Sequence, residues 1–340
     1  MANPYYRRVH AGGAAVKQLM TSSEGIFIAD DRLRPIWRFF LSLILVFAVL
    51  VMTSAVLGTT FRTAHVHPSL WVVAFWQSLV GLAGILGGFK VMTATFEGRP
   101  LGSMGLAFHP RWWKELIHGL MAGAAMLFLA VIVEWASGLA HFTLNSSSVW
   151  RPGLFTFVVF ALAAANEEAT FRGYSFQRLA ESITSAGAVA VMSTMFGLAH
   201  FLNPHRTWVS TLNTALVGIP FCIAYLRTRS LWMPIGMHFI WNFLLGFFLG
   251  LPVSGIMLPA SILVSKVKGP AWLTGGDYGP EGGLLATAAI LIVAVYLLLG
   301  KSIYTTEEMK ALVFAPVKSK WPAPPTSIVA SLSEEQANRD

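Results

Sequence analysis

Long apolar stretches alternate with short polar segments over most of this 340-residue chain. A helix needs about 20 mainly apolar residues to cross the hydrocarbon core of a bilayer. Eight stretches come close to that length, at residues 39–57, 70–89, 116–139, 154–171, 184–202, 208–226, 231–251 and 284–300. The pattern predicts an all-α, polytopic membrane bundle of about eight transmembrane helices.

The composition agrees with a membrane protein. Hydrophobic residues make up 55% of the chain and charged residues only 12%, whereas soluble domains carry about 25% charged residues. The net charge of +8 comes from basic residues that flank the apolar stretches, where they set topology and meet anionic headgroups. We therefore expect the lipid bilayer, and no nucleic acid, as a partner. The single cysteine, Cys222, excludes an intrachain disulfide and a cysteine-rich metal site.

The basic residues also predict the orientation. With the amino terminus in the cytoplasm, most Lys and Arg residues fall on the cytoplasmic side, so both termini are expected there. Residues 1–38 are then a basic cytoplasmic segment, 39–304 the transmembrane bundle, and the proline-containing 305–340 a disordered cytoplasmic tail. The long loop 252–283, rich in Gly and Pro, is expected to cover one mouth of the bundle.

Two adjacent carboxylates, Glu167 and Glu168, interrupt the fourth apolar stretch. An ionised acid in hydrocarbon costs at least ~2.5 kcal/mol and is by default functional. Neighbouring helical residues point about 100° apart, whereas Arg172 lies four residues beyond Glu168, at ion-pair spacing. We expect Glu168 to pair with Arg172 and Glu167 to face the interior as a general base. An ion-pair network that only fixes helix packing is the alternative.

Two later apolar stretches add His200 and His238. A lone intramembrane histidine usually makes an interhelical hydrogen bond, but His238 is followed four residues later by Asn242, on the same helical face. Together they could offer two donors to a developing oxyanion. The remaining polar groups in or beside apolar stretches are interpreted as structural: His118, His141 and Glu134.

In combination, Glu167-Glu-Ala-Thr-Phe-Arg172, Phe196-x-x-x-His200 and His238-x-x-x-Asn242 resemble the three motifs of the CPBP family. These are the CAAX prenyl protease type 2 and bacteriocin-processing intramembrane proteases, also called the Abi family. The resemblance covers about residues 152–251, the catalytic core. Residues 101–106 and 279–283 are also similar to segments of relatives.

The resemblance implies an eight-span intramembrane endopeptidase, either of CAAX type or for peptide maturation, with a polar cavity that opens toward the cytoplasm. Glu167 would activate water, His200 would position it, and His238 and Asn242 would stabilise the oxyanion. Glu168 and Arg172 would support them by orienting groups and balancing charge. The substrate would be a membrane-associated protein or peptide, and the protein would reside in a bacterial cell (inner) membrane.

Metal dependence stays open at this point. Glu167, His200 and His238 could supply a His₂Glu zinc set with one position for water, but no helical HExxH pair is present. We favour a glutamate-driven reaction without a metal or other cofactor, with zinc as the alternative. A proton-coupled transporter and a non-catalytic immunity or scaffold protein are the other hypotheses; Asn242 favours the protease, because a proton relay needs no carboxamide there.

The predicted helix directions raise a difficulty of depth. Glu167 and His238 fall nearer the inner side of the membrane, whereas His200 lies late in a helix that runs outward. For the three side chains to meet, the fourth or fifth span has to tilt, break or start elsewhere. Polar backbone breaks are tolerated where they line a water-filled cavity, and we predict such a cavity here.

Overall fold

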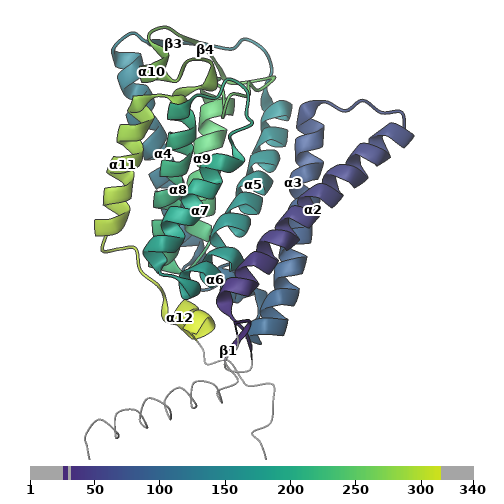
Figure 1. The fold of residues 1–340 in the computed structure, drawn as a ribbon. Coiled ribbons are helices and arrows are strands. Elements are labelled where there is room, and N and C mark those ends of the chain that lie inside the picture. The colour runs from purple at the N-terminus through teal and green to yellow at the C-terminus, as the bar shows by residue number, and fades with distance from the viewer. Residues whose placement is uncertain (1–25, 30–31, 315–340) are drawn as a thin grey trace, which may run out of the picture.

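Apolar helices run alternately up and down between two ends of the molecule (Figure 1). The computed structural model describes residues 26–29 and 32–314. Each of the eight predicted stretches is helical over most of its length. The helices are α2 Pro35–Thr63, α3 Leu70–Met92, α4 Trp112–Ala136, α5 Trp150–Arg172, α7 Ser185–Ala199, α8 Trp208–Thr228, α9 Trp232–Phe243 and α11 Leu284–Leu299.

Five helical segments in the described part of the chain are long and apolar enough to cross a membrane. They comprise α2, α3 with the following π-helical turn η1 (Thr93–Glu97), α4, α5 with α6 (Tyr174–Ser182), and α8. Shorter apolar helices are α7, α9 with the π-helical η3 (Leu244–Phe248), and α11. The structure thus confirms an all-α polytopic bundle, while a count of eight spans stays a prediction.

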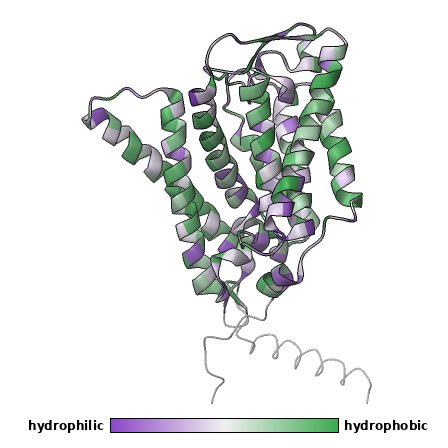
Figure 2. Ribbon diagram, turned by 180° about the vertical axis from the view of Figure 1, so that it is seen from behind, coloured by the Kyte–Doolittle hydropathy of each residue, from purple (hydrophilic) through white to green (hydrophobic). Residues whose placement is uncertain are grey.

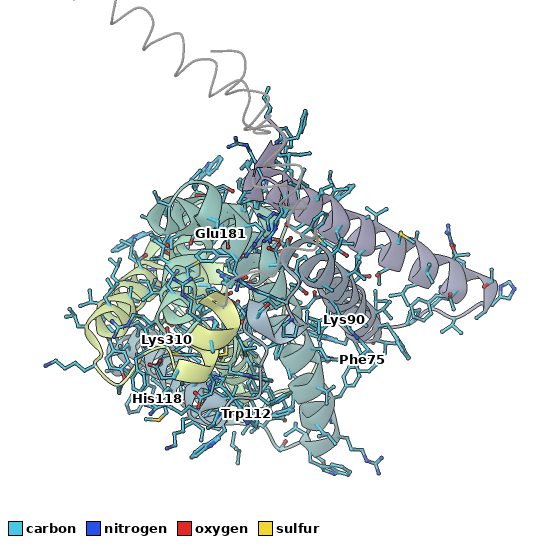
Figure 3. All side chains as sticks on the ribbon, turned by 90° about the horizontal axis from the view of Figure 1, so that it is seen from below. Phe75, Lys90, Trp112, His118, Glu181 and Lys310 are labelled. Carbon is cyan, nitrogen blue, oxygen red and sulfur yellow. The ribbon has the colours of Figure 1, made fainter. Side chains whose placement is uncertain are left out.

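The two ends of the bundle differ in character. The lower end in Figure 1 carries α6, α12 (Glu307–Phe314) and the short strands β1 (Ile28–Ala29) and β2 (Arg32–Leu33). Hydrophilic residues gather there, below helices that are mostly hydrophobic (Figure 2), and the view from below shows Lys90, Glu181 and Lys310 (Figure 3). Residues 1–25 of the predicted basic segment and 315–340 of the predicted tail lie outside the described residues.

The tail, predicted to be disordered from residue 305, begins with a helix instead. Thr306 Oγ1 accepts a hydrogen bond from the Met309 backbone N–H at 3.3 Å and so caps α12. Met309 and Val313, four residues apart, are both buried, and α12 contacts the 3₁₀ turn η2 (Leu101–Met104). Arg99 Nη1 donates to the Val313 carbonyl at 2.6 Å. The prediction failed here because this polar segment has one apolar face that docks on the bundle.

The upper end is closed by a small sheet that the sequence did not predict. Strand β3 (Ala140–Leu144) pairs antiparallel with β4 (Leu263–Val267), from Ala140 opposite Val267 to Leu144 opposite Leu263. The loop that contains β4 also carries α10 (Ala271–Thr274) and the 3₁₀ turns η4 (Gly276–Tyr278) and η5 (Pro280–Gly282). Figure 1 places these elements over the upper mouth of the bundle, as expected for the loop 252–283.

Close backbone contact fixes α4 against α9. A Cβ atom on Gly119 would lie 2.1 Å from the Met233 carbonyl oxygen, and one on Gly123 would lie 2.4 Å from that of Met237. Small residues allow helices in membranes to approach this closely. The contact sets the position of α9, which carries His238 and Asn242.

A buried ion cluster joins α2, η1 and α6 at the lower end. Glu97 forms ion pairs with Arg38 and with Arg178, the latter at 2.7 Å. The other carboxylate oxygen of Glu97 accepts a hydrogen bond from the Tyr174 hydroxyl at 2.8 Å. A buried acid held by two guanidinium groups and a hydroxyl is well compensated, so this cluster fastens the tilted α2 to the rest of the bundle.

Candidate active site

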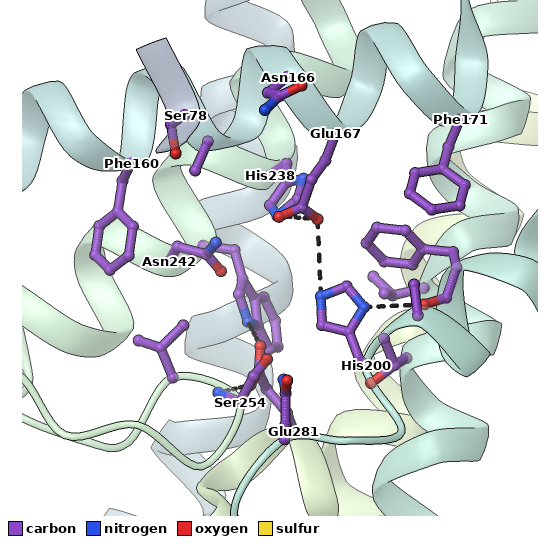
Figure 4. Close-up of a pocket in the computed structure, with 18 of the residues that line it drawn as sticks. Ser78, Phe160, Asn166, Glu167, Phe171, His200, His238, Asn242, Ser254 and Glu281 are labelled. Carbon is purple, nitrogen blue, oxygen red and sulfur yellow. Dashed lines mark hydrogen bonds and ion pairs between the residues drawn. The ribbon is translucent and has the colours of Figure 1, made fainter. Parts of the chain in front are cut away.

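A cavity of about 500 Å³ opens among the helices and contains all four residues that the sequence predicts as catalytic: Glu167, His200, His238 and Asn242. Figure 4 shows them around one space. The walls come from α2, α3, α5, α7, α8, α9, α11 and the loop after η3. Helix α5 contributes to both hydrophobic clusters of the bundle, one centred on α4, α8, α9 and α11 and the other on α2, α3, α6 and α7.

Glu167 is the point on which the two imidazoles converge. Its Oε2 atom lies 3.7 Å from His200 Nε2 and 3.8 Å from His238 Nε2. These distances exceed a direct hydrogen bond but fall within reach through one water molecule. The Glu167 side chain is 33% exposed, and its Oε2 makes no hydrogen bond with any described residue. The three predicted residues therefore meet at the cavity.

His200 meets the others because α7 is short. Thr184 Oγ1 accepts a hydrogen bond from the Gly187 backbone N–H at 3.0 Å and starts the helix, which ends at Ala199 after 15 residues. At 1.5 Å per residue that is about 22 Å, less than the ~30 Å of a hydrocarbon core. His200 caps the helix end within the bundle, and the chain leaves α7 as irregular backbone that lines the cavity. The depth difficulty is thereby resolved.

Each imidazole is fixed through its Nδ1 atom. His200 Nδ1 lies 2.9 Å from the Phe196 carbonyl oxygen, and His238 Nδ1 lies 2.9 Å from Glu168 Oε1. Because a carbonyl and a carboxylate only accept hydrogen bonds, both Nδ1 atoms carry the proton. This leaves both Nε2 atoms directed at Glu167, which is the orientation that a second partner commonly imposes on a functional histidine.

Glu168 and Arg172 form the predicted ion pair, with Oε1 and Nη1 3.0 Å apart and both side chains fully buried. The sequence did not indicate the contact between Glu168 and His238. Because of this contact, Glu168 Oε1 binds both the Arg172 guanidinium and the His238 imidazole. The Arg172 guanidinium lies over the rings of Phe196 and Phe221, 4.4 and 5.2 Å from their centroids, a favourable cation–π arrangement.

Asn242 lines the cavity one helical turn beyond His238, as the spacing predicts. Its carboxamide forms no hydrogen bond with the described residues and is therefore free to bind a group in the cavity. The helix then changes to the π-helical η3 at Leu244, a kind of irregularity that is frequent at functional sites. The predicted oxyanion donors therefore share one wall of the cavity.

Sequence reasoning missed the part of the site that comes from the upper loop. Glu281, on η5, reaches the cavity and accepts a hydrogen bond from Trp241 Nε1 at 2.8 Å. Ser254 in the same loop also lines the cavity. The similarity of residues 279–283 to segments of relatives was the available signal, but nothing in the spacing connected Glu281 to a helix 40 residues earlier.

The three residues considered as zinc ligands, Glu167, His200 and His238, meet in this cavity. In residues 26–29 and 32–314, no group of three or more His, Cys, Asp or Glu side chains is arranged to hold a metal ion. This holds also for the set considered for zinc, Glu167 with His200 and His238.

A bundle of apolar helices that encloses an acid, two imidazoles and a carboxamide contains the groups that proton transfer and oxyanion stabilisation require. Residues 149–244 match the model of a family described as type II CAAX prenyl endopeptidase, Rce1-like. The match spans α5 to the start of η3 and includes Glu167, His200, His238 and Asn242. Over these residues the chain is similar to this CAAX protease family. A search of curated proteins finds no match.

Proposed function

We propose that this protein is an endopeptidase that hydrolyses a peptide bond near the membrane surface, with Glu167 as the base that activates water. The observation that supports this most directly is the placement of Glu167 Oε2 within 3.8 Å of two imidazole Nε2 atoms whose orientation is already fixed. A water molecule held between the carboxylate and His200 would lose a proton to Glu167 as its oxygen attacks the substrate carbonyl carbon.

The oxyanion that forms needs donors on the opposite side of the attacked carbonyl. Asn242 can donate from its amide, and His238 can donate from Nε2 when its ring carries a proton on each nitrogen. His238 lies between the carboxylates of Glu167 and Glu168. Glu167 then passes its proton to the leaving amine, and the peptide bond breaks.

The substrate is proposed to be a membrane-associated protein or peptide, in keeping with the family. Val46 and Leu50 of α2 and Ala74 of α3 line the cavity together with Glu167, so an apolar segment could lie along these helices with its scissile bond at the carboxylate. By the positive-inside rule the end with α6 and α12 faces the cytoplasm. A bacterial inner membrane with both termini inside remains our proposal for the location.

The test is cleavage of a membrane-anchored reporter by purified protein in lipid nanodiscs. Glu167→Ala and Glu167→Gln should abolish cleavage while the variants stay folded, and retained cleavage by either would refute the role of Glu167. A chelator such as 1,10-phenanthroline, and added zinc after it, separate the two mechanisms. We expect neither to change the rate; loss with the chelator and recovery with zinc would establish the metal alternative.

A further inference from the structure

The cavity contains a second carboxylate that the proposed chemistry does not use. Glu281 lies on η5, and in Figure 4 it faces the cavity from the side opposite Glu167, with Ser254 and His200 close by. Its side chain is part-exposed to that space rather than buried in protein. An acid in such a position needs an explanation, because a charge within a membrane bundle is costly and is functional by default.

Neutral donors hold the Glu281 carboxylate in place. Oε1 accepts the Trp241 Nε1 hydrogen at 2.8 Å, and Oε2 accepts from the Ser254 hydroxyl at 2.9 Å and from the Ser254 backbone N–H. Three donors and no acceptor suit an ionised carboxylate. Glu281 forms no ion pair with any residue in the described part of the chain, so its charge is oriented by these bonds but not neutralised by them.

The backbone beneath Glu281 is also clamped. Asn213 Nδ2, on α8, donates to the carbonyl oxygens of Glu281 and Gly283 at 2.9 and 2.8 Å. The Asn213 side-chain oxygen accepts in turn from Thr287 Oγ1 at 2.6 Å. A residue held by its backbone and by both carboxylate oxygens is pre-organised, and pre-organised polar groups give a site selectivity at little cost in entropy.

The other charges around the cavity do not offset Glu281. The described residues that line it include two carboxylates, Glu167 and Glu281, two histidines, and neither Lys nor Arg. Arg172 lies behind Phe196 and Phe221, fully buried and paired with Glu168. A cleft with walls of one sign focuses its potential on whatever enters, and here that potential is negative.

We infer that Glu281 is a specificity-determining residue, whose carboxylate binds a Lys or Arg side chain of the substrate close to the scissile bond and disfavours an Asp, Glu or free terminal carboxylate there. This inference rests on the proposed protease function for the identification of the ligand as a peptide. The inference adds a substrate class to the proposed function: an apolar segment with a basic residue, and not an acidic one, near the cleavage site.

The experiment uses an apolar, membrane-inserting reporter peptide with one varied residue, Lys, Gln or Glu, placed in turn at each of the four positions on either side of the cleaved bond. Cleavage by the intact protein in nanodiscs gives kcat/KM for each peptide. At one or two positions we expect the Lys peptide to exceed the Glu peptide by about tenfold or more, the order of one charge–charge contact near a protein surface. At the other positions the Lys, Gln and Glu peptides should have similar values of kcat/KM.

Variants then assign the preference to Glu281. Glu281→Gln keeps the shape and removes the charge, so the Lys-to-Glu ratio should fall close to one. Ser254→Ala removes one donor to the same carboxylate but leaves its charge and the backbone donor, so the ratio should fall only in part. Glu307→Gln removes a charge from the exposed helix α12 and should keep the ratio. Unfolding of each variant in the nanodisc is measured in parallel.

Binding provides the readout if a variant cleaves poorly. On the Glu167→Gln protein, fluorescence anisotropy of the same three peptides gives Kd without turnover, and we expect the Lys peptide to bind most tightly at the sensitive position. Equal values of kcat/KM and Kd for Lys, Gln and Glu peptides at every position would overturn the inference. Cleavage that survives in Glu167→Gln would instead refute the proposed function, so the two failures are distinguishable.

Discussion

Glu167 and Glu168 are neighbours in the sequence, but their surroundings are so different that the same substitution should affect stability at one position and mainly activity at the other. Glu168 is fully buried, and its Oε1 holds Arg172 at 3.0 Å and His238 at 2.9 Å. Glu168→Gln would leave the buried guanidinium without a counter-charge. Removing one partner of a buried ion pair costs about 3–5 kcal/mol, so the variant should lose that much unfolding free energy.

Glu167→Gln removes the charge of a side chain that is 33% exposed and whose Oε2 lies 3.7 Å or more from the two imidazoles. Little unfolding free energy depends on it, on the order of 1 kcal/mol or less, as for exposed ion pairs. Activity should fall instead, because a positioned general base contributes about 10²–10⁴-fold. Glu167→Gln should therefore be folded and inactive, whereas Glu168→Gln should be destabilised as well as slow.

Two assays on the same samples test this division of roles between Glu167 and Glu168. Reversible unfolding in mixed micelles gives the free energy, and cleavage of the reporter peptide gives kcat/KM. Glu307→Gln, in the exposed helix α12, is the control for loss of one negative charge and should match the wild type in both. Equal destabilisation by the two variants, or an active Glu167→Gln, would refute the division of roles between the two acids.

Three further predictions test the packing and the buried charges. Gly123→Ala places a methyl group 2.4 Å from the Met237 carbonyl, so it should cost about 1–3 kcal/mol of unfolding free energy, as overpacking does, and lower kcat/KM by displacing α9. Glu97→Gln leaves the buried Arg38 without an acid, whereas Arg178 keeps its ion pair with Glu181. Unfolding in micelles should show a loss of about 3–5 kcal/mol, with little effect on the pH profile of cleavage. Burial lowers the pKa of His109, so near this pKa the folded protein binds fewer protons than the unfolded chain. The unfolding free energy should therefore fall as the pH drops below about 6.5. In the His109→Gln variant the unfolding free energy should fall less over the same pH range.

The helices and the core of the site could be predicted because their signals are local. An apolar run of sufficient length predicts a membrane helix wherever it packs. The pairing of Glu168 with Arg172 and the shared face of His238 and Asn242 follow from helical spacing alone. Because Glu168 was assigned to Arg172, Glu167 remained as the unpaired acid, and the structure places its side chain in the cavity.

Contacts between distant segments gave no such signal. Glu97 meets Arg38 and Arg178 across 59 and 81 residues of sequence, and each of these residues, taken alone, is only a charge near the end of an apolar stretch. Glu281 likewise depends on Trp241, 40 residues earlier. The short helix α12 was missed because its docking face is only two residues wide.

The position of His200 shows why local signals alone left the site incomplete. Apolar residues continue to Leu202, so hydropathy extends the fifth span across the bilayer and carries the imidazole away from Glu167. In the structure α7 stops at Ala199, and Asn203 N–H bonds back to the His200 carbonyl at 3.1 Å in a turn. Such a turn among membrane helices is stable only where it borders a polar space. The early end of α7 and the cavity beside Glu167 therefore depend on each other, and a substitution that fills the cavity with an apolar side chain should also disturb this turn.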